Sequence, residues 1–246
     1  VVAGCGVTVA KHGNRSISSQ CGSADLLEAL GVRIDVEPEL VEEAVETIGI
    51  GFLFAPRYHS AMRFAARARK EVGLRSIFNM LGPLTNPAGA NCQLIGVYAP
   101  ELTEMFAATL RLLGSRRALV VHGHDGLDEI SVCAPTRVAE LADDQVRTYN
   151  IDPTDYFGAL ADPAALRGGD PGANAAITLE VLEGRTGPRR DVVLLNAAAA
   201  LMAAGQARDL RDGLGLAAAA IDDGRALAKL EQLVQFTRAA DPPAPA

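Results

Sequence analysis

Short apolar segments alternate with segments of helical periodicity along the first half of the chain, and this alternation constrains the fold more than any other feature. Apolar runs of strand type occur at 7–10, 51–54, 94–98 and 118–121, and helical spacing of apolar residues occurs at 39–48, 59–72 and 101–113. Strands and helices that alternate in this way pack as helices on a sheet that is at least partly parallel. The sequence therefore predicts an α/β protein.

The second half of the chain predicts an extension of this sheet and then a helical region. Segments 130–132, 137–141 and 146–151 have the pattern of short strands joined by turns, which favours an antiparallel extension. From residue 174 the chain is rich in Ala and Leu, and helices are predicted at 191–203, 213–222 and 224–238. We expect residues 1–240 to form a single α/β domain and the Pro/Ala tail 241–246 to be disordered.

Charge and cysteine usage limit the classes of function. A formal net charge of -7 argues against a general nucleic-acid-binding surface, because such binding depends on neutralising phosphates with Lys and Arg. No apolar run reaches transmembrane length, so we expect no membrane partner. The four scattered cysteines contain no C-x-x-C pair, which indicates reduced thiols in a cytoplasmic protein: Cys5, Cys21, Cys92 and Cys133.

A loop rich in hydrogen-bond donors follows the first predicted strand. Gly13 and Gly22 let its backbone come close to a ligand, and a helix is predicted to begin at Ala24 and to end at Gly31. The N-terminus of a helix suits phosphate because its N–H groups are free and carry a partial positive charge. The pattern favours an anion site over the alternative, a solvated turn with a Ser N-cap. The polar residues of this loop are Lys11, His12, Asn14, Arg15, Ser16, Ser18, Ser19 and Ser23.

An arginine lies on the apolar stripe of the helix predicted at 59–72. Ala65, Ala66 and Arg69 follow Met62 at the i+3, i+4 and i+7 spacing of one helix face. An inward guanidinium needs an anionic partner, because an unpaired buried charge is very costly. Arg69 is therefore either the clamp of a carboxylate substrate, which its planar fork suits, or part of an internal ion pair.

Two adjacent carboxylates close a glycine-containing loop after the strand predicted at 118–121. They are Asp128 and Glu129, at the end of the string VVHGHDGLDE (120–129). Loops at the carboxyl ends of strands are where α/β sheets bind ligands, and carboxylate oxygens beside phosphates are preferred by Mg²⁺. The alternative is an ordinary surface turn. Together with a phosphate loop elsewhere in the chain, the pair favours metal-assisted phosphate chemistry.

Four strings of the sequence closely resemble the anthranilate phosphoribosyltransferase family. The resemblance extends to about Arg238, and it implies a fold of the nucleoside phosphorylase/phosphoribosyltransferase type, with a central mixed, mostly parallel sheet flanked by helices. It implies transfer of phosphoribosyl from phosphoribosyl pyrophosphate (PRPP) to anthranilate in tryptophan biosynthesis, with Mg²⁺ as cofactor, and a homodimer. The strings are KHGNRSISSQCGSADLLEALG (11–31), GFLFAPRYHSAMRFAARARKEVGLRSIFNMLGPLTNPA (51–88), VVHGHDGLDEISV (120–132) and RRDVVLLNAAAAL (189–201).

The resemblance also implies roles for individual residues. Asp128 and Glu129 would hold Mg²⁺, and anthranilate would be contacted by Asn14, Arg69, His12 and His59. The residues implied for PRPP are Lys11, His12, Gly13, Asn14, Arg15, Ser16, Ile17, Ser18, Ser19 and Ser23. No residue is assigned as acid or base, because the nitrogen of an aromatic amine is barely basic and the reaction needs no covalent intermediate.

Two alternative functions stay open at this point. One is a non-enzymatic nucleic-acid-binding relative of the same fold, against which the acidic net charge and the lack of a basic patch interleaved with aromatic residues both count. The other is a phosphoribosyltransferase or phosphorylase with a different acceptor. A pyrimidine nucleoside phosphorylase is expected to have a different motif at the first loop and no carboxylate clamp such as Arg69.

The beginning of the chain departs from the family pattern. The family has a small helical domain and a glycine-rich GTGGD loop before the strand that leads into KHGNR, and residues 1–10 contain neither. We therefore expect a chain truncated at its N-terminal side. On its own, such a chain is expected to associate through uncovered apolar surface and to lack the transferase activity.

Overall fold

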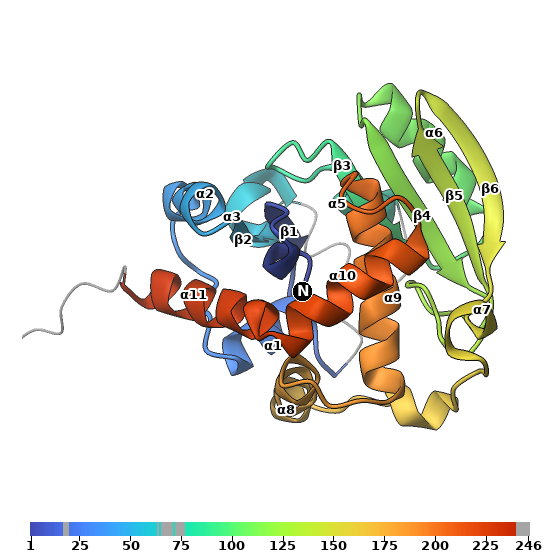
Figure 1. Cartoon of the computed structure of the whole chain (residues 1–246). Helices are drawn as coiled ribbons and strands as arrows, with labels where there is room; N and C mark the ends of the chain where they lie inside the picture. The colour runs from blue at the N-terminus through green and yellow to red at the C-terminus, as the bar shows by residue number, and fades with distance from the viewer. Residues whose placement is uncertain (17–19, 63, 65–70, 72–76, 240–246) are drawn as a thin grey trace, which may run out of the picture. The chain divides into compact units, whose positions relative to one another are not determined.

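The computed structural model describes residues 1–16, 20–62, 64, 71 and 77–239. Within it the chain divides into two compact units (Figure 1). The four-stranded unit comprises residues 1–7, 90–167 and 179–227, and the two-stranded unit comprises residues 8–89, 168–178 and 228–246. Two helices, α8 (Pro171–Leu182) and α11 (Arg225–Ala239), contribute residues to both units.

The four-stranded unit is built on a mixed sheet with the strand order β3-β4-β5-β6. The strands β3 (Cys92–Gly96) and β4 (Arg117–Gly123) are parallel, and α6 (Leu102–Leu112) connects them. The strands β5 (Thr136–Ala142) and β6 (Gln145–Ile151) continue the sheet in antiparallel pairing. Asp143 and Asp144 join them with positive φ angles, which is the backbone of a tight hairpin turn.

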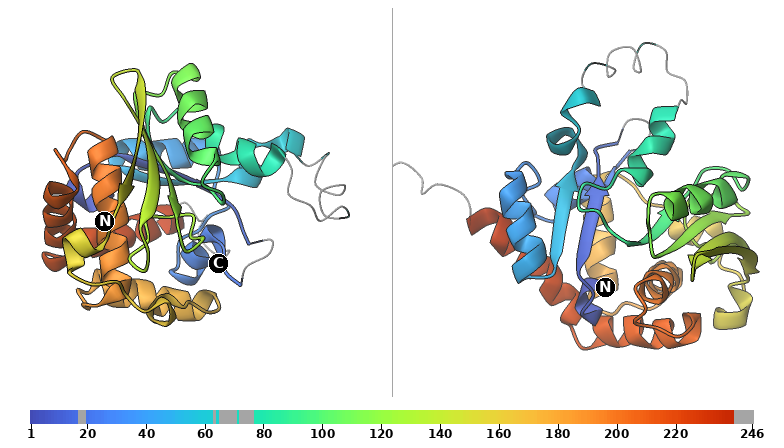
Figure 2. Two further views of the ribbon diagram at one scale, coloured as in Figure 1. Left: turned by 90° about the vertical axis from the view of Figure 1, so that its right-hand side faces the viewer. Right: turned by 90° about the horizontal axis from the view of Figure 1, so that it is seen from above.

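Helices cover this sheet on both faces. Figure 2 shows α6 and α9 (Pro188–Ala203) on opposite sides of it. Leu119 and Val121 of β4 share a buried cluster with Leu195 of α9, whereas Val120 points to the other face because side chains alternate along a strand. Burial on both faces explains why 118–121 is a continuous apolar run. The unit also contains η1 (Ala3–Cys5), α7 (Thr154–Phe157), η3 (Pro163–Leu166) and α10 (Leu210–Asp222).

The two-stranded unit pairs β1 (Val9–Gly13) with β2 (Ile50–Phe54) in parallel. The helix α2 (Pro38–Thr47) packs against β2 (Figure 2). Leu233 of α11 packs with Phe52 in a buried cluster. Pairing with β2 therefore fixes the end of β1, from which the donor-rich segment starts. The unit also contains α1 (Ser23–Ala29), α3 (Ala55–Tyr58), η2 (Ser60–Met62) and α5 (Ile77–Leu84).

The predicted α/β class, with a mixed sheet and flanking helices, is confirmed. The described strands form two sheets and not one, and the four-stranded sheet is not mostly parallel, because β4–β5 and β5–β6 are antiparallel. The helices predicted at 39–48 and 101–113 correspond to α2 and α6, and the antiparallel extension corresponds to β5 and β6. The strand predicted at 7–10 runs instead from Val9 to Gly13, because Lys11, His12 and Gly13 continue the pairing with β2. The sequence analysis placed these three residues in a loop.

The strand predicted at 130–132 is wrong. The N–H and C=O of Ile130 bond to the side-chain amide of Asn196, and the N–H of Ser131 donates to the hydroxyl of Thr136. The carbonyl of Val132 accepts the backbone N–H of Ala161, which lies outside any strand. Ile130 and Val132 are buried in the core of the four-stranded unit. The apolar pattern at 130–132 therefore results from burial and not from strand pairing.

Two expectations fall on residues outside the described ranges. Of the helix predicted at 59–72, residues 60–62 form η2, whereas Arg69 and most of the remaining positions are not described. The tail at 241–246 also lies outside the described residues.

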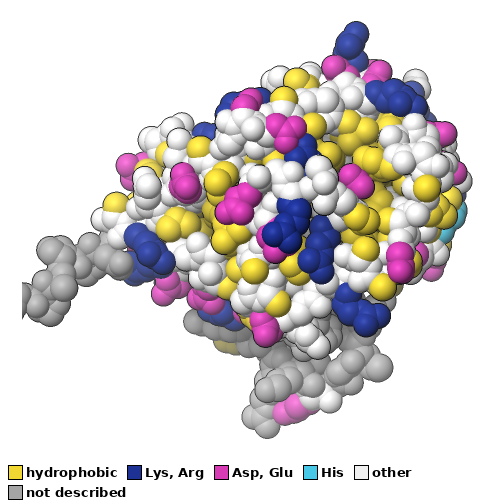
Figure 3. All heavy atoms as spheres, turned by 60° about the horizontal axis from the view of Figure 1, so that its bottom comes forward, with side chains coloured by type: hydrophobic (Ala, Val, Ile, Leu, Met, Phe, Trp, Pro, Cys, Tyr) yellow, Lys and Arg dark blue, Asp and Glu magenta, His cyan; other side chains and the backbone are white. Residues whose placement is uncertain are grey.

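The face drawn in Figure 3 carries charges of both signs. Lys and Arg side chains are interspersed on it with Asp and Glu side chains and do not gather into one patch. In the part of the chain that the structure describes, no helix combines the length and the apolar character that crossing a bilayer requires.

The contact between α9 and α10 generates a prediction about stability. A Cβ on Gly213 of α10 would lie 2.8 Å from the Cα and the carbonyl oxygen of Ala198, whereas a Cβ on Gly215 would meet nothing within 4 Å. We expect Gly213→Ala to lower the free energy of unfolding by about 1–3 kcal/mol, because the two helix backbones must separate. The matched control Gly215→Ala should raise it by roughly 0.5–1 kcal/mol through helix propensity. Urea unfolding of both variants checks this, and equal effects would contradict the close packing.

Candidate functional site

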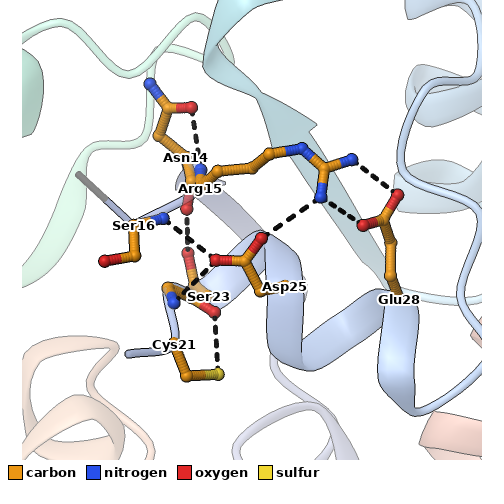
Figure 4. Close-up of polar contacts among 8 residues, drawn as sticks. Asn14, Arg15, Ser16, Cys21, Ser23, Asp25 and Glu28 are labelled. Carbon is orange, nitrogen blue, oxygen red and sulfur yellow. Dashed lines mark hydrogen bonds and ion pairs between the residues drawn. The ribbon is translucent and has the colours of Figure 1, made fainter. Parts of the chain in front are cut away.

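The donor-rich segment between β1 and α1 is tied back onto the start of α1 (Figure 4). The carbonyl oxygen of Asn14 accepts the backbone N–H of Ala24 at 3.2 Å and the hydroxyl of Ser23 at 3.4 Å. The side-chain oxygen of Asn14 accepts the N–H of Arg15 at 2.8 Å. These bonds hold the first residues of the segment against the first turn of the helix, and we call residues 14–22 the donor loop.

Asp25 closes the donor loop from inside the first turn of α1. One carboxylate oxygen accepts the backbone N–H of Ser16 at 3.0 Å and that of Gly22 at 2.9 Å, so it bonds both ends of the loop (Figure 4). These backbone donors are the main reason why the pKa of Asp25 is lowered. The bond to Gly22 is half of a capping box, because the acid lies three residues after the N-cap. Both N–H groups are thus bonded within the protein.

The two glycines of this region allow the chain to pack on itself. A Cβ on Gly22 would lie 2.3 Å from the backbone nitrogen of Ser16, and a Cβ on Gly13 would lie 2.4 Å from the hydroxyl oxygen of Ser23. Any larger residue would force these segments apart. The sequence predicts that the backbone approaches a ligand at both glycines, whereas in the structure other residues of the protein lie against them.

Arg15 is paired with two carboxylates of α1. Its guanidinium donates to both oxygens of Glu28, one of them at 2.7 Å, and to Asp25 at 3.2 Å (Figure 4). It also lies over the ring of Phe54, 5.7 Å from the centroid. The positive charge that the sequence analysis assigned to phosphate binding is therefore already balanced by side chains of the protein. Lys11, in β1, is exposed.

His12 and His59 face each other beside this loop. Their Nε2 atoms are 3.1 Å apart, and their rings are nearly perpendicular with centroids 4.9 Å apart. One nitrogen donates and the other accepts, so the pair cannot carry two protonated rings at this distance. Burial, and then the neighbouring His59, lower the pKa of His12. His12 is therefore a neutral hydrogen-bonding group at neutral pH.

Asp128 and Glu129 lie in a tightly bonded loop after β4. The N–H of Gly123 donates to the carbonyl of Leu127 at 2.8 Å, and the hydroxyl of Ser131 donates to the carboxylate of Asp125 at 2.6 Å. Both Asp128 and Glu129 are exposed. We call residues 124–131 the acidic loop. The sequence predicted a loop that presents two carboxylates after this strand, and the structure has that loop.

The donor set of the acidic loop fits magnesium better than zinc or calcium. Among the described residues, no group of three or more His, Cys, Asp or Glu side chains is placed to hold a metal ion. Magnesium is usually bound by one or two carboxylates, with its remaining positions filled by water and substrate phosphates, whereas a protein cage supplies most ligands to calcium or structural zinc. Two neighbouring exposed carboxylates match the magnesium pattern.

Four of the predicted site residues, Ile17, Ser18, Ser19 and Arg69, lie outside the described residues. The structure brings Asn14, Arg15 and Ser16 of the donor loop together with Ser23, the first residue of α1. It also brings His12 together with His59. The sequence analysis missed Asp25 and Glu28 as partners of the donor loop. The position of Asp25, three residues after Gly22, is a capping-box signal that could have identified it.

Comparison with known proteins gives one consistent result. Residues 1–227 match the model of the family described as "Glycosyl transferase family, a/b domain". The chain is 71% identical over 237 residues to an anthranilate phosphoribosyltransferase of Syntrophobacter fumaroxidans, covering 96% of this chain and 70% of that protein. It is 67% identical over 238 residues to an anthranilate phosphoribosyltransferase of Desulfatibacillum aliphaticivorans, covering 97% of this chain and 70% of the relative.

Solved structures agree with these relatives. Anthranilate phosphoribosyltransferase from Thermus thermophilus superposes with a TM-score of 0.90 at 46% identity, covering 96% of this chain and 70% of that one. The Saccharomyces cerevisiae enzyme in complex with PRPP and Mg superposes with a TM-score of 0.87 at 28% identity, covering 97% of this chain and 68% of that one.

The role of Asp25 can be tested through the amides that it accepts. We expect Asp25→Asn to speed hydrogen exchange at the N–H groups of Ser16 and Gly22, because a neutral amide oxygen is a weaker acceptor than a carboxylate. The matched control is Glu28→Gln, which also removes a carboxylate next to Arg15 but touches neither amide. Mass-spectrometric exchange on both variants measures the effect. Unchanged exchange in Asp25→Asn, or an equal change in the control, would contradict closure by Asp25.

The lowered pKa of His12 predicts how stability depends on pH. A group whose folded pKa lies below its unfolded value of about 6.5 takes up its proton more readily when unfolded, so stability is lost as the pH falls through this range. We expect the melting temperature of the native protein to fall more steeply between about pH 7.5 and pH 5 than that of His12→Gln. His124→Gln, in the exposed turn after β4, is the control. Parallel curves for His12→Gln and the native protein would show that His12 is not responsible.

Proposed function

The chain belongs to the anthranilate phosphoribosyltransferase family, and we propose on this basis that it transfers the phosphoribosyl group of PRPP to anthranilate and releases pyrophosphate. The reaction is a step of tryptophan biosynthesis. The observation that carries the proposal is the identity of 71% over 237 residues, which spans the donor loop, the histidine pair and the acidic loop.

We propose that the donor loop and the end of β1 bind PRPP. Lys11 is exposed and supplies a cation, while Asn14, Ser16, Ser23 and the backbone around Gly13 supply neutral hydrogen-bonding groups. Arg15 is paired with Asp25 and Glu28, so it holds the loop in shape and contributes little free charge. Ile17, Ser18 and Ser19 complete the proposed contact on the basis of the resemblance alone.

Asp128 and Glu129 are proposed to hold Mg²⁺. When bound, the ion neutralises the negative charge that grows on pyrophosphate as the bond to the ribose breaks. The protein's part is to present the two carboxylates from a loop whose own bonds fix its backbone. The two side chains are exposed, which leaves them accessible to an ion that also carries water and phosphate ligands.

Anthranilate is proposed to lie by Asn14, His12 and His59, with Arg69 as the partner of its carboxylate. A neutral His12 does not compete as a cation for the carboxylate of anthranilate. The amine then attacks the anomeric carbon, and positioning it can contribute on the order of several kcal/mol. No side chain is assigned as acid or base. A homodimer and the absence of nucleic-acid binding stay predictions from the sequence.

The test uses the protein expressed from its full reading frame and supplied with PRPP, anthranilate and Mg²⁺. We expect loss of anthranilate with stoichiometric release of pyrophosphate. Joint Asp128→Asn and Glu129→Gln substitution should lower the rate by about a hundredfold and raise the Mg²⁺ requirement, because the leaving group loses its charge neutralisation.

The matched control replaces the acidic pair in the β5–β6 turn, as Asp143→Asn with Asp144→Asn. It removes the same charge, and Asn tolerates the positive φ angles found there. This variant should keep the rate and the metal dependence of the native protein. If pyrophosphate is released only with another acceptor, that acceptor takes the place of anthranilate in the proposal. If no acceptor leads to release of pyrophosphate, the transferase function is refuted.

A further inference from the structure

One asparagine of α9 makes a double hydrogen bond to the residue that follows the acidic pair. The side-chain oxygen of Asn196 accepts the N–H of Ile130 at 2.9 Å, and its nitrogen donates to the carbonyl of Ile130 at 2.8 Å. The same nitrogen donates to the carbonyl of Val192 in the preceding turn of α9, at 2.9 Å. The amide is thus held by its own helix and holds the acidic loop in turn.

The burial of Ile130 makes this double bond necessary. Its side chain is fully buried and packs in the cluster that contains Leu195 and Ala198 of α9. The residue has left the sheet, so no neighbouring strand meets its N–H and C=O. Backbone groups that are buried without a partner cost free energy, and Asn196 supplies both partners. The N–H of Ile130 belongs to the peptide unit whose carbonyl comes from Glu129, so the bond fixes the orientation of that peptide.

A glycine of β3 restrains the other side of the pair. A Cβ on Gly96 would lie 1.5 Å from the carbonyl oxygen of Asp128 and 2.5 Å from its carbonyl carbon. The backbone at the end of β3 therefore lies directly against the backbone of Asp128, and no side chain fits between them at Gly96. Asp128 is placed by Gly96, and the peptide after Glu129 is placed by Asn196. Between these two fixed points, Asp128 and Glu129 are both exposed.

We propose that Asn196 is a positioning residue for the metal site: it sets the backbone from which Asp128 and Glu129 meet Mg²⁺. The inference rests on the proposed function for the identity of the ion. Carboxylates that are fixed before the ion arrives lose less conformational freedom on binding, and residues that orient metal ligands contribute about tenfold to a hundredfold in metal affinity. Asn196 itself is proposed to contact neither the substrate nor the ion.

A second asparagine provides a matched control. The side-chain oxygen of Asn174 accepts the N–H of Gly169 at 2.9 Å, and its nitrogen donates to the carbonyl of Gly169 at 3.1 Å. This is the same double bond to one backbone residue, and the segment carries no proposed metal ligand. Asn174→Ala therefore measures what loss of such a bond costs in stability alone.

The experiment compares Asn196→Ala, the milder Asn196→Ser and Asn174→Ala in the full protein. Binding of Mn²⁺ in the presence of pyrophosphate is followed by electron paramagnetic resonance, and the Mg²⁺ concentration that gives half of the maximal rate is measured separately. We expect the Asn196 variants to weaken Mn²⁺ binding and to raise the half-activating Mg²⁺ concentration by about tenfold, with the rate recovering at high Mg²⁺. Asn174→Ala should lower the melting temperature and leave both metal readouts unchanged.

The outcomes separate the inference from the function on which it rests. Joint Asp128→Asn and Glu129→Gln substitution should change both Mn²⁺ binding and the half-activating Mg²⁺ concentration. If it does, and the Asn196→Ser variant is folded but changes neither, Asn196 is only a structural residue. Equal metal effects of the Asn196 and Asn174 variants would also overturn the inference. If the native protein neither binds Mn²⁺ with pyrophosphate nor uses PRPP, the proposed function fails first.

Discussion

One carboxylate oxygen of Asp25 accepts the backbone N–H groups of Ser16 and Gly22, and this shared acceptor holds together the two described parts of the donor loop. Neither Ser16 nor Gly22 lies in a strand or a helix that would supply a backbone partner. The carboxylate of Asp25, in the first turn of α1, accepts these N–H groups instead. Because Gly22 has no side chain, its backbone can lie close to that of Ser16, so that both reach Asp25. Bonds within the protein therefore hold Asn14 and Ser16 next to Ser23, the first residue of α1.

The acidic loop is organised by the same principle in the other unit. Asn196 bonds the backbone of Ile130, Thr136 bonds that of Ser131, and the hydroxyl of Ser131 reaches Asp125. In the first two contacts a short polar side chain replaces the partner that a sheet would have provided, and the third joins two side chains of the loop. Such bonds allow the chain to leave regular structure at one defined residue. Both loops with proposed ligands start where a strand ends, β1 in one unit and β4 in the other.

How far the sequence predicts this architecture depends on whether a feature is local. The strand at 118–121 and the helix at 101–113 are predictable because burial produces their apolar patterns. The loop that carries Asp128 and Glu129 is predictable because it directly follows an apolar strand. The interpretation of 130–132 as a strand fails because burial of Ile130 gives the same pattern, while the partner of its backbone lies 66 residues away in Asn196. The pairing of Arg15 with Glu28 depends on the rotamers of two long side chains, which no local pattern specifies.

The charge balance of the donor loop explains why a metal ion is needed in the proposed reaction. Arg15 contacts two carboxylates, so this group of three side chains carries one net negative charge and does not attract a polyanion on its own. Lys11 is a second cation in the described part of the loop and the end of β1, and its charge takes no part in these contacts of Arg15. A single exposed ammonium is weak compensation for a pyrophosphate, because water screens it strongly. On the proposed function, most of the neutralisation therefore falls to the ion held by Asp128 and Glu129. This also gives a reason why the backbone around that pair is fixed from two sides.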